Sequence, residues 1–387
     1  MVKIIRAATI GMSLNIFCRG LLSELKDEGY EVIALSSPDG DLAELGRREK
    51  VRTIGVSMER HVSPLKDLIS LIRLIRVMRK ERPVMVHSMT PKAGLLCMMA
   101  AWIAHVPIRV HTFTGLVWPT QTGLSRKILM LTDRITCFCA THIIPEGEGV
   151  KHDLSSCITD KPMRVLGYGN VRGVDLDYWK RSGGSRTEGW LSERREKKEP
   201  FTFVFVGRIV RDKGINELVN AFSRLNKNYP DTRLLLVGPV EDDLDPVLPE
   251  TRMAIEKEES IISVGSQKDV RPYYEASDAL VFPSYREGFP NVVLEAGAME
   301  LPSIVTDING SREIIEEGVN GVIVPPRDES ALYEAMEDMV THPEKVSKMS
   351  AKSRPMIAAR YEQSFVRMNL KHFYSELFLK NVCGVKE

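Results

Sequence analysis

The sequence predicts an α/β protein of two doubly wound domains, each with a parallel sheet. Three observations point to this class. The chain has 387 residues, which at about 150 residues per domain suits two domains. Short apolar segments alternate with helical patterns in both halves of the chain. Most of these segments are apolar throughout and end in Gly, Pro or Ser, as expected of parallel strands covered by helices on both faces.

The first domain is expected over residues 1–175. Its first strand lies within MVKIIRAATI, which lacks the sustained apolar core and the cleavage site of a signal peptide. The spacing of apolar residues predicts helices at 13–28, 64–80, 92–104 and 124–139. The other strand candidates are EVIALSS, VRTIGV, VMVHSM, IRVHTF, HIIP and MRVLG.

The second domain is expected over residues 201–360 and repeats this alternation. Residues 176–200, between the domains, are dense in charge and poor in aliphatic side chains, which predicts a linker or an excursion loop. Residues 361–379 are expected to form a final helix that can pack back on the first domain. The strand candidates of the second domain are FTFVFVGR, RLLLVGP, IISVGS, ALVFPS, PSIVTD and GVIVPP.

The composition argues against a membrane-spanning or disulfide-linked protein. The longest apolar stretch, Leu95 to Ala104, is shorter than the roughly 18 residues needed to span a bilayer. The cysteines show no CxxC spacing, which predicts reduced thiols, no metal cluster and a cytoplasmic protein. The six cysteines are Cys18, Cys97, Cys137, Cys139, Cys157 and Cys383.

Charge is distributed unevenly along the chain. Residues 1–200 carry 31 Lys and Arg against 22 Asp and Glu, a net charge of +9, whereas residues 201–387 carry 22 against 30, a net charge of −8. The basic half is expected to meet an anionic partner. The near-neutral total charge and the lack of an aromatic stacking motif argue against nucleic acid as that partner.

The segment SYREGFPNVVLEAGAMELPSIVTD, residues 284–307, contains the densest chemical signal. It places Glu287 in a loop after an apolar strand, Pro290 and Asn291 at the start of a helix, and Glu295 on the early turns of that helix. The N–H groups at a helix start can bind phosphate, and flanking carboxylates can accept hydrogen bonds from sugar hydroxyls. Two isolated glutamates at this spacing are more often solvated charges.

A second motif, VFVGRIVRDKG at residues 204–214, makes the first more specific. An apolar strand delivers Arg208 at its carboxyl end and Lys213 just before a helix. Ligands of open parallel sheets bind beyond the carboxyl ends of the strands, so two cations there suit a diphosphate. Either cation alone could be a surface charge.

With both motifs present, the chain resembles the retaining glycosyltransferases of the GT-B architecture, in particular glycosyltransferase family 4 (GT4). The resemblance covers nearly the whole chain and is strongest to bacterial members that build capsule, O-antigen and lipid-linked oligosaccharides. It implies two Rossmann-like domains with parallel sheets facing an interdomain cleft. Further segments similar to this subgroup are SLN (13–15), HSMTPKAGL (87–95), RVHTFTGL (109–116) and GYGNVRGVDLDYW (167–179).

The resemblance implies a donor site on the second domain. Arg208 and Lys213 would hold the nucleotide diphosphate, and Glu295 would hold the ribose. Glu287 would contact hydroxyls of the donor sugar as a catalytic residue. The backbone that would cradle the phosphates and the sugar belongs to Gly288, Phe289, Pro290, Asn291 and Val292.

The resemblance also assigns a catalytic role to His111, which matches the HTxxG pattern of the family at the end of the strand IRVHTF. The ring or the backbone of the equivalent histidine stabilises positive charge that develops on the donor sugar. The family mechanism implies retention of configuration without a protein nucleophile, because the leaving diphosphate accepts the proton of the acceptor. Positive charge from Arg208 and Lys213 would make a metal unnecessary, so no metal site and no cofactor are expected.

Three residues of the first domain are expected to bind the diphosphate of an acceptor. Asn15 and Arg19 lie near the first helix, and Lys92 begins a later helix in TPKAG. Simple surface solvation is the alternative for each. The chain has a single glycine, Gly11, where many relatives have a Gly-Gly turn, which is expected to reshape the acceptor side.

The helix within residues 63–83 is expected to contact a membrane surface. At about 100° per residue its basic residues form one stripe with apolar neighbours, a mixture that suits anionic headgroups. A core helix with a solvated basic face is the alternative. The stripe is Lys66, Arg73 and Lys80, flanked by Ile69 and Val77, and the side expected to be buried carries Leu68, Leu71, Ile75 and Met78.

Together these features predict a peripheral-membrane retaining glycosyltransferase on the inner face of the cell membrane. It would move a hexose or an N-acetylhexosamine from a UDP-sugar to a polyprenyl-diphosphate-linked saccharide. The alternatives are a GT-B enzyme with a soluble acceptor, a nucleotide-sugar epimerase of the same fold, and a non-catalytic nucleotide-sugar-binding protein.

Overall fold

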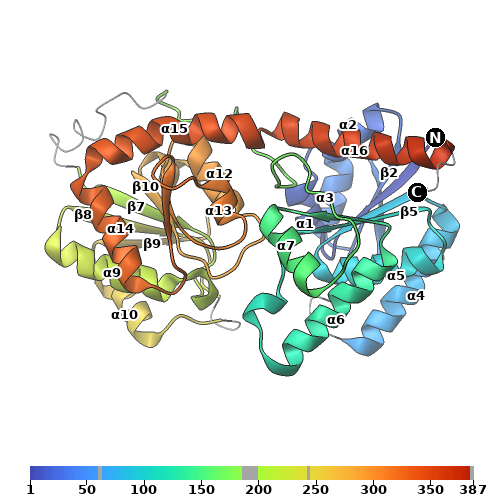
Figure 1. Cartoon of the computed structure of the whole chain (residues 1–387), viewed down its shortest axis with the longest axis horizontal. Coiled ribbons are helices and arrows are strands. Elements are labelled where there is room, and N and C mark those ends of the chain that lie inside the picture. The colour runs from blue at the N-terminus through green and yellow to red at the C-terminus, as the bar shows by residue number, and fades with distance from the viewer. Residues whose placement is uncertain (60–62, 185–198, 242–244, 384–387) are drawn as a thin grey trace. The chain divides into compact units, whose positions relative to one another are not determined.

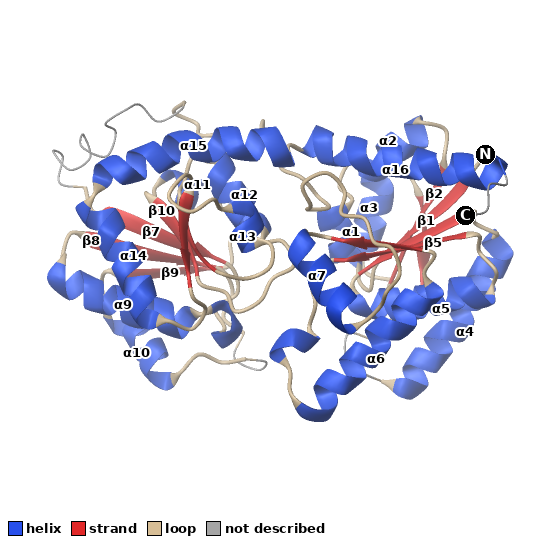
Figure 2. Ribbon diagram, viewed as in Figure 1, coloured by secondary structure: helices blue, strands red, loops and turns tan. Residues whose placement is uncertain are grey.

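The computed structural model of the chain describes residues 1–59, 63–184, 199–241 and 245–383, and it forms two compact units. Unit 1 comprises residues 1–173 together with the chain from Ser364 onward, and unit 2 comprises residues 174–363. Each unit contains one parallel sheet with helices on both faces, as Figure 1 and Figure 2 show.

The sheet of unit 1 has six parallel strands in the order β3-β2-β1-β4-β5-β6. This order reverses direction between β1 and β4, so the sheet is doubly wound. All strands but β3 are largely buried, which agrees with their continuous apolar sequences. The strands are β1 (Lys3–Ala7), β2 (Glu31–Ser36), β3 (Arg52–Gly55), β4 (Met85–Met89), β5 (Ile108–Phe113) and β6 (His142–Pro145).

Two hydrophobic clusters cover the two faces of this sheet. Alternate residues of β1 divide between them, since Ile4 belongs to one cluster and Ile5 to the other. One face is covered by α1 (Gly11–Phe17), α2 (Leu21–Asp27), α3 (Gly40–Glu49) and α16 (Gln363–Cys383). The other is covered by α4 (Pro64–Glu81), α5 (Pro91–Ile103), α6 (Gly123–Cys139) and α7 (Glu148–Cys157), with the short 3-10 helix η1 (Trp118–Thr120) before α6.

The last helix, α16, is held on unit 1 by a buried arginine. The Arg6 guanidinium donates to the Tyr374 hydroxyl at 2.6 Å and to His87 Nδ1 at 2.5 Å. Burial, together with the neighbouring Arg6, keeps the pKa of His87 well below its usual value, so its imidazole is neutral. Phe373 and Leu377 complete the apolar contact. The helix expected at 361–379 is therefore present as α16 and packs on the first domain.

Unit 2 repeats the architecture. Its strand order, β12-β11-β10-β7-β8-β9, is the same pattern read from the other edge, and it reverses direction between β7 and β10. Phe203, Phe205 and Phe222 are fully buried in a single large core. The strands are β7 (Phe201–Val206), β8 (Thr232–Val237), β9 (Ile261–Gly265), β10 (Ala279–Phe282), β11 (Ser303–Thr306) and β12 (Gly321–Val324).

The helices of unit 2 pack in two groups. The helix α9 packs against α10 and α14, and α12 packs against α13 and α15. A short 3-10 helix, η2 (Arg211–Lys213), precedes α9. The helices are α9 (Ile215–Asn228), α10 (Pro249–Lys257), α11 (Arg271–Glu275), α12 (Asn291–Ala298), α13 (Ser311–Ile314), α14 (Glu329–Thr341) and α15 (Pro343–Tyr361).

Two expected elements differ in the structure, and two observed helices were not expected. The helix predicted at 13–28 is divided into α1 and α2 at Gly20, whose φ of 76° interrupts the helix. The segment MRVLG is not a strand, because only Met163 bridges to β6 before the chain turns through Gly167 and Gly169. The helices α3 and α7 were not predicted.

The expected linker at 176–200 is also shorter than predicted. Val174 and Trp179 are buried in the core of unit 2, and the Arg354 guanidinium donates to the Trp179 carbonyl at 2.6 Å. Residues 176–184 therefore belong to unit 2, and residues 185–198 lie outside the described part of the chain.

Two findings concern the membrane and the thiols. Within the described ranges, none of the helices combines the length and the apolar character needed to cross a bilayer. Cys18, Cys97, Cys137, Cys139 and Cys157 are free thiols, and all but Cys157 are buried. The side chain of Cys383 lies outside the described residues.

Candidate functional site

The sheet of unit 2 brings the two charged motifs together where its strand order reverses. The strands β7 and β10 are hydrogen-bonded neighbours, and both run in the same direction. Arg208 and Lys213 follow β7, and the loop from Pro283 to Pro290 follows β10. The carboxyl ends of parallel strands at such a switch point form the usual ligand site of doubly wound sheets.

Lys213 and Glu287 form an ion pair at this switch point. Their side chains are 17% and 18% exposed, so solvent shields the pair only partly. The Ser284 hydroxyl donates to Glu287 Oε1 at 2.9 Å, and the Lys213 ammonium lies 5.4 Å from the centre of the Phe282 ring. An anionic ligand could replace Glu287 as the partner of Lys213 and leave the carboxylate available to hydroxyl groups.

The other cations of the two loops are paired as well. Arg208 lies 2.9 Å from a carboxylate oxygen of Glu241, and this pair is largely exposed. Arg286 and Asp212 join the two loops at 3.1 Å. The sequence motifs did not identify Glu241, Asp212 or Ser284, because nothing in their spacing relates them to the cations they contact.

The backbone around the start of α12 is held by a close approach to Gly310. A Cβ atom on Gly310 would lie 2.5 Å from the Gly288 carbonyl oxygen and 2.7 Å from the Phe289 Cα. The N-cap of α12 is Pro290, which has no side-chain oxygen to cap the helix, and the Val293 N–H donates to the Pro290 carbonyl at 3.1 Å. The positive end of the α12 dipole is therefore not offset by a capping side chain. Val292 lies in the first turn of α12, and Glu295 is buried one turn further on.

In unit 1, the corresponding switch point lies between β1 and β4 and holds hydroxyl groups in place of charges. Thr9 and Thr90 follow these strands, and their hydroxyl oxygens are 2.8 Å apart. The Gly11 N–H donates to Asp39 Oδ2 at 2.9 Å, and a Cβ on Gly11 would lie 2.2 Å from Asp39 Oδ1. Gly11 is therefore required by the contact between α1 and the start of α3.

His111 lies at the carboxyl half of β5, but its ring is buried, with 1% of its surface exposed. Nδ1 is 2.8 Å from the Ser88 hydroxyl, and a Cβ on Gly94 would lie 2.4 Å from the ring carbon Cε1. Burial lowers the pKa of His111 to about 3, so the imidazole is neutral at physiological pH. The ring therefore carries no positive charge. Only the dipole of the neutral ring or the backbone of His111 could act on a bound sugar.

The three expected acceptor residues lie on α1, on the turn after it, and on α5. Lys92 forms an ion pair with Asp67 at 2.6 Å, and both side chains are largely buried. Asn15 donates to the Asp41 carbonyl at 3.0 Å. Arg19 is exposed, and its carbonyl accepts a hydrogen bond from Arg367. Lys92 is therefore not the solvated cation that the alternative interpretation assumed.

The helix α4 carries apolar and basic residues on the same outward face. Its buried line is Ser70, Leu74 and Met78, so Leu68, which was expected on the buried side, is exposed. This correction follows from the i, i+4 spacing of the buried residues. Val77, expected beside the basic stripe, is half-buried against the core.

Further exposed apolar residues lie on α5, which packs beside α4, and on α6, which packs beside α5 (Figure 1). Trp102 of α5 contacts Phe138 of α6, with ring centroids 6.0 Å apart. We call this set the apolar-basic surface. Its exposed apolar members are Leu65, Leu68, Ile69, Ile72, Trp102, Leu124, Ile128, Leu131 and Phe138, and its exposed cations include Lys66, Arg73, Arg76, Lys80, Arg126 and Lys127.

Comparisons with known proteins agree with this geometry. Residues 200–342 match the family model "Glycosyl transferases group 1", and residues 14–158 match "Glycosyl transferase 4-like domain". The chain is 30% identical over 386 residues to the capsular polysaccharide biosynthesis glycosyltransferase CapM of Staphylococcus aureus, with 99% of each chain covered. It belongs to the GT4 family of glycosyltransferases.

Two further relatives of this glycosyltransferase are informative. An Escherichia coli UDP-Gal:alpha-D-GlcNAc-diphosphoundecaprenol alpha-1,3-galactosyltransferase is 29% identical over 323 residues, which cover 81% of this chain and 80% of that protein. The crystal structure of Anabaena HepE in complex with UDP has a TM-score of 0.77 at 16% identity and covers 97% of this chain and 100% of that one. The predicted family and the predicted GT-B class, with two doubly wound domains, are confirmed.

Sequence reasoning missed one more polar group of this glycosyltransferase. Asp133 of α6 lines a pocket with His111, Thr90 and Trp118. No family motif includes Asp133. The helical pattern around it is also what a solvent-exposed aspartate would show, so the sequence did not indicate that Asp133 lines a pocket. Burial raises its pKa to about 7, and the Trp118 indole N–H offsets part of that rise.

Proposed function

We propose that this glycosyltransferase transfers a hexose or an N-acetylhexosamine from a UDP-sugar to a polyprenyl-diphosphate-linked saccharide, with retention of configuration. The observation that carries the proposal is the Lys213–Glu287 ion pair at the switch point of unit 2. The full-length similarity to CapM supports a role in polysaccharide assembly. The named reaction of the E. coli relative supports a UDP-sugar and a lipid diphosphate.

The donor would bind at the carboxyl edge of the unit 2 sheet. Lys213 and Arg208 would exchange Glu287 and Glu241 for the oxygens of the diphosphate, which carries more charge than either carboxylate. Glu287, released from Lys213, would accept hydrogen bonds from hydroxyls of the donor sugar. The Ser284 hydroxyl would keep the Glu287 carboxylate in place.

Transfer would break the bond between the anomeric carbon and the diphosphate oxygen. The acceptor hydroxyl oxygen would then form the new bond on the same face, and a diphosphate oxygen would take its proton. Lys213, Arg208 and the start of α12 would stabilise the negative charge that develops on the leaving group. Because these groups already provide positive charge, we propose that no metal is required.

The acceptor would bind to unit 1, the basic half of the chain. Lys92 and Arg19 would contact the diphosphate of the acceptor, with Lys92 exchanging Asp67 for phosphate oxygens. Asn15 Oδ1, which is buried and accepts no hydrogen bond from the described residues, leaves an acceptor for a further polar group. His111 would orient the reacting sugar through its neutral ring or its backbone.

The apolar-basic surface supports contact with the anionic membrane in which such an acceptor is held. Its residues Leu65, Ile69 and Ile72 share the outward face of α4 with Arg73 and Lys80. Apolar side chains can enter the headgroup region while the cations contact lipid phosphates. Apolar burial and electrostatic attraction would therefore both contribute to the free energy of membrane binding. The protein would then act at the cytoplasmic face as a peripheral enzyme.

The experiment is a donor panel. The protein is incubated with UDP-glucose, UDP-galactose, UDP-N-acetylglucosamine and UDP-N-acetylgalactosamine, with and without polyprenyl-diphosphate N-acetylglucosamine in anionic vesicles, and UDP release is measured. We expect acceptor-dependent release from one donor, unchanged by EDTA, and an NMR spectrum of the product that shows the anomeric configuration of the donor.

Three outcomes would contradict the proposal. Turnover of a UDP-sugar without an acceptor would support the epimerase alternative. Turnover only with soluble saccharides would remove the lipid acceptor. Nucleotide-sugar binding without any turnover would support a non-catalytic binding protein.

A further inference from the structure

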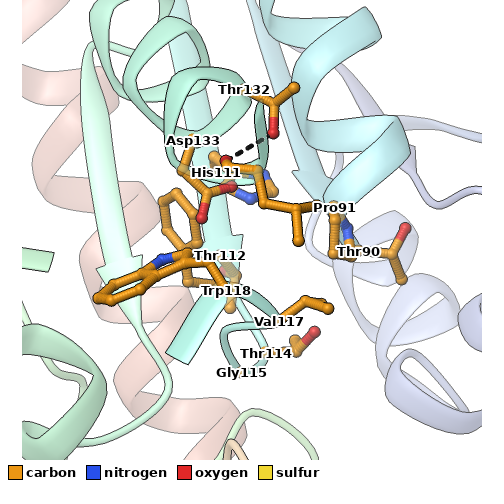
Figure 3. Close-up of a pocket in the computed structure, with 12 residues that line it drawn as sticks. Thr90, Pro91, His111, Thr112, Thr114, Gly115, Val117, Trp118, Thr132 and Asp133 are labelled. Atoms are coloured by element: carbon orange, nitrogen blue, oxygen red, sulfur yellow. Dashed lines mark hydrogen bonds between the residues drawn. The ribbon is translucent and has the colours of Figure 1, made fainter. Parts of the chain in front are cut away.

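A narrow polar pocket lies beyond the carboxyl ends of β4 and β5 in unit 1. Its walls come from the loop after β5, from the start of α5 and from α6. Figure 3 shows the Asp133 carboxylate and the Trp118 indole close together in this pocket, with Thr114 nearby. This is the edge of a parallel sheet at which ligands bind, but none of the family motifs that we identified assigns the Trp118–Asp133 side of it.

The Trp118 indole is the first sign that the pocket is built for a ligand. Trp118 is 3% exposed, and its Nε1 faces the Asp133 carboxylate, whose pKa it lowers, but it makes no hydrogen bond of normal geometry with any residue that the structure describes. Burying an N–H donor without an acceptor costs free energy, so native proteins rarely leave one unmatched. The unsatisfied donor lines the pocket, where a ligand oxygen could accept its hydrogen.

Asp133 is the second sign. Its carboxyl group is half-buried, and burial and the Trp118 indole, with no cation among the described residues, account for its shifted pKa. The charged and titratable groups around it are the neutral His111 of β5, and Cys137 and Arg126 of α6, with Arg126 lying 5.5 Å from the centre of the Trp118 ring. A carboxyl group placed this way can accept a hydrogen bond when ionised and donate one when protonated.

The dimensions and the lining of the pocket limit the chemistry of its ligand. The space has room for about one to two water-sized groups, so a whole sugar ring does not fit. Thr90, Thr114 and Thr132 add hydroxyl groups to the wall, and the Thr132 hydroxyl donates to the Leu129 carbonyl at 2.7 Å, as drawn in Figure 3. A neutral group that both donates and accepts hydrogen bonds matches this wall better than an anion, which Asp133 would repel.

We propose that the Trp118–Asp133 pocket receives one hydroxyl or hydroxymethyl group of the acceptor saccharide and so determines which acceptor sugar is used. The Trp118 N–H donates to the hydroxyl oxygen, and the Asp133 carboxylate accepts the hydroxyl hydrogen. Both residues act as specificity-determining residues and not as the groups that carry out transfer. This inference rests on the proposed function, because it takes unit 1 as the acceptor-binding unit.

The test compares the loss of a ligand hydroxyl with the loss of its protein partner. The acceptors are polyprenyl-diphosphate N-acetylglucosamine and a set of analogues that each lack one ring hydroxyl or the hydroxymethyl oxygen. The proteins are the full-length wild type, Asp133→Asn, Trp118→Phe and the control Asp160→Asn, which changes an exposed aspartate of unit 1. Thermal melting checks that each variant folds.

We expect the wild type and Asp160→Asn to bind one analogue about tenfold more weakly than the parent acceptor, as measured by acceptor KM or by calorimetry. Asp133→Asn and Trp118→Phe should weaken the parent acceptor and lose this discrimination, while the KM of the UDP-sugar stays unchanged. Acceptor binding by the wild type should also change between pH 6 and 8, and this change should be absent in Asp133→Asn.

Equal discrimination in all four proteins, or none in the wild type, would overturn the inference. A wild type that transfers no sugar at all would contradict the proposed function, and the calorimetric comparison would still decide the pocket. The two failures are therefore distinguishable.

Discussion

The two units have the same strand order but different chemistry at the point where that order reverses. In unit 2, the loops after β7 and β10 meet through ion pairs, Lys213 with Glu287 and Arg286 with Asp212. In unit 1, the loops after β1 and β4 meet through the hydroxyls of Thr9 and Thr90. One fold thus presents a charged site in one unit and a largely uncharged one in the other.

This difference fits the two partners of a glycosyl transfer. A nucleotide diphosphate is highly charged, and cations that already have exchangeable carboxylate partners can bind it without leaving unpaired charges in the empty site. An acceptor hydroxyl is neutral, so it needs hydrogen-bonding groups such as those around Trp118 and Asp133. At the two switch points, the comparison predicts that charge removal damages unit 2 and that hydrogen-bond removal damages unit 1, whereas the unit 1 charges proposed for the acceptor diphosphate, Lys92 and Arg19, lie outside this contrast.

The largest effect is expected from removing the cation of the unit 2 pair. Lys213→Ala should lower kcat by about 10²-fold or more, because the leaving diphosphate loses a partly buried positive charge. The measurement is UDP release at saturating acceptor. The control Lys227→Ala removes an exposed lysine of α9 and should leave kcat unchanged. If Lys213→Ala kept the wild-type kcat, the charged site of unit 2 would not be needed for transfer.

The next effect concerns the apolar-basic surface of unit 1. The double change Ile72→Glu with Leu131→Glu should lower partitioning into anionic vesicles about tenfold, because two exposed apolar contacts become negative charges. Vesicle co-sedimentation measures it. Met253→Glu changes an exposed apolar residue of unit 2 and should partition like the wild type. Equal loss in both variants would show that the surface has no special role.

Removing a buried hydrogen bond should destabilise unit 1. Tyr374→Phe deletes the hydroxyl that accepts from Arg6 and leaves the buried guanidinium with one fewer partner. The free energy of unfolding of unit 1 should fall by about 1–3 kcal/mol in urea denaturation followed by circular dichroism. The matched change at an exposed tyrosine, Tyr168→Phe, should cost much less. Equal costs would mean that the Arg6 contacts do not hold α16.

The last effect is the pH dependence contributed by Asp133. Its pKa is about 7 in the folded protein and near 3.8 when unfolded, so its contribution to stability is present below about pH 4 and is lost as the pH rises through 7. Asp133→Asn has no such titration. The free energy of unfolding of the wild type should therefore fall relative to that of the variant by about 3 kcal/mol between pH 4.5 and 8. Parallel profiles from urea denaturation would contradict this.

Much of the fold was predictable because parallel strands covered on both faces have a continuous apolar sequence. The strands of both units were predicted this way, and the candidate MRVLG forms no strand. The break at Gly20 was missed because the apolar pattern continues across it on both sides. The inclusion of residues 176–184 in unit 2 was not predicted, because Trp179 is buried by distant residues of α15 and α11, which the local composition does not reveal.

The unit 2 site was predictable to a greater extent than the unit 1 site. Arg208, Lys213 and Glu287 are charged residues at strand ends, so their position in the sequence already suggests a ligand. The neutrality of His111 and the perturbed Asp133 depend on burial, which arises from packing between α5, α6 and β5. No local pattern encodes that burial, and for the same reason the exposure of Leu68 was misjudged.

The most direct test of the central claim uses Glu287→Gln, which keeps the size of the side chain and an oxygen that can accept from Ser284 but removes the charge that pairs with Lys213. Calorimetry measures UDP affinity, and acceptor-dependent UDP release measures turnover. The account predicts that UDP binds at least as tightly as to the wild type, because Lys213 no longer has to leave a carboxylate. It also predicts that turnover falls by about 10²-fold, because the donor sugar loses its carboxylate partner. Weaker UDP binding with unchanged turnover would contradict it.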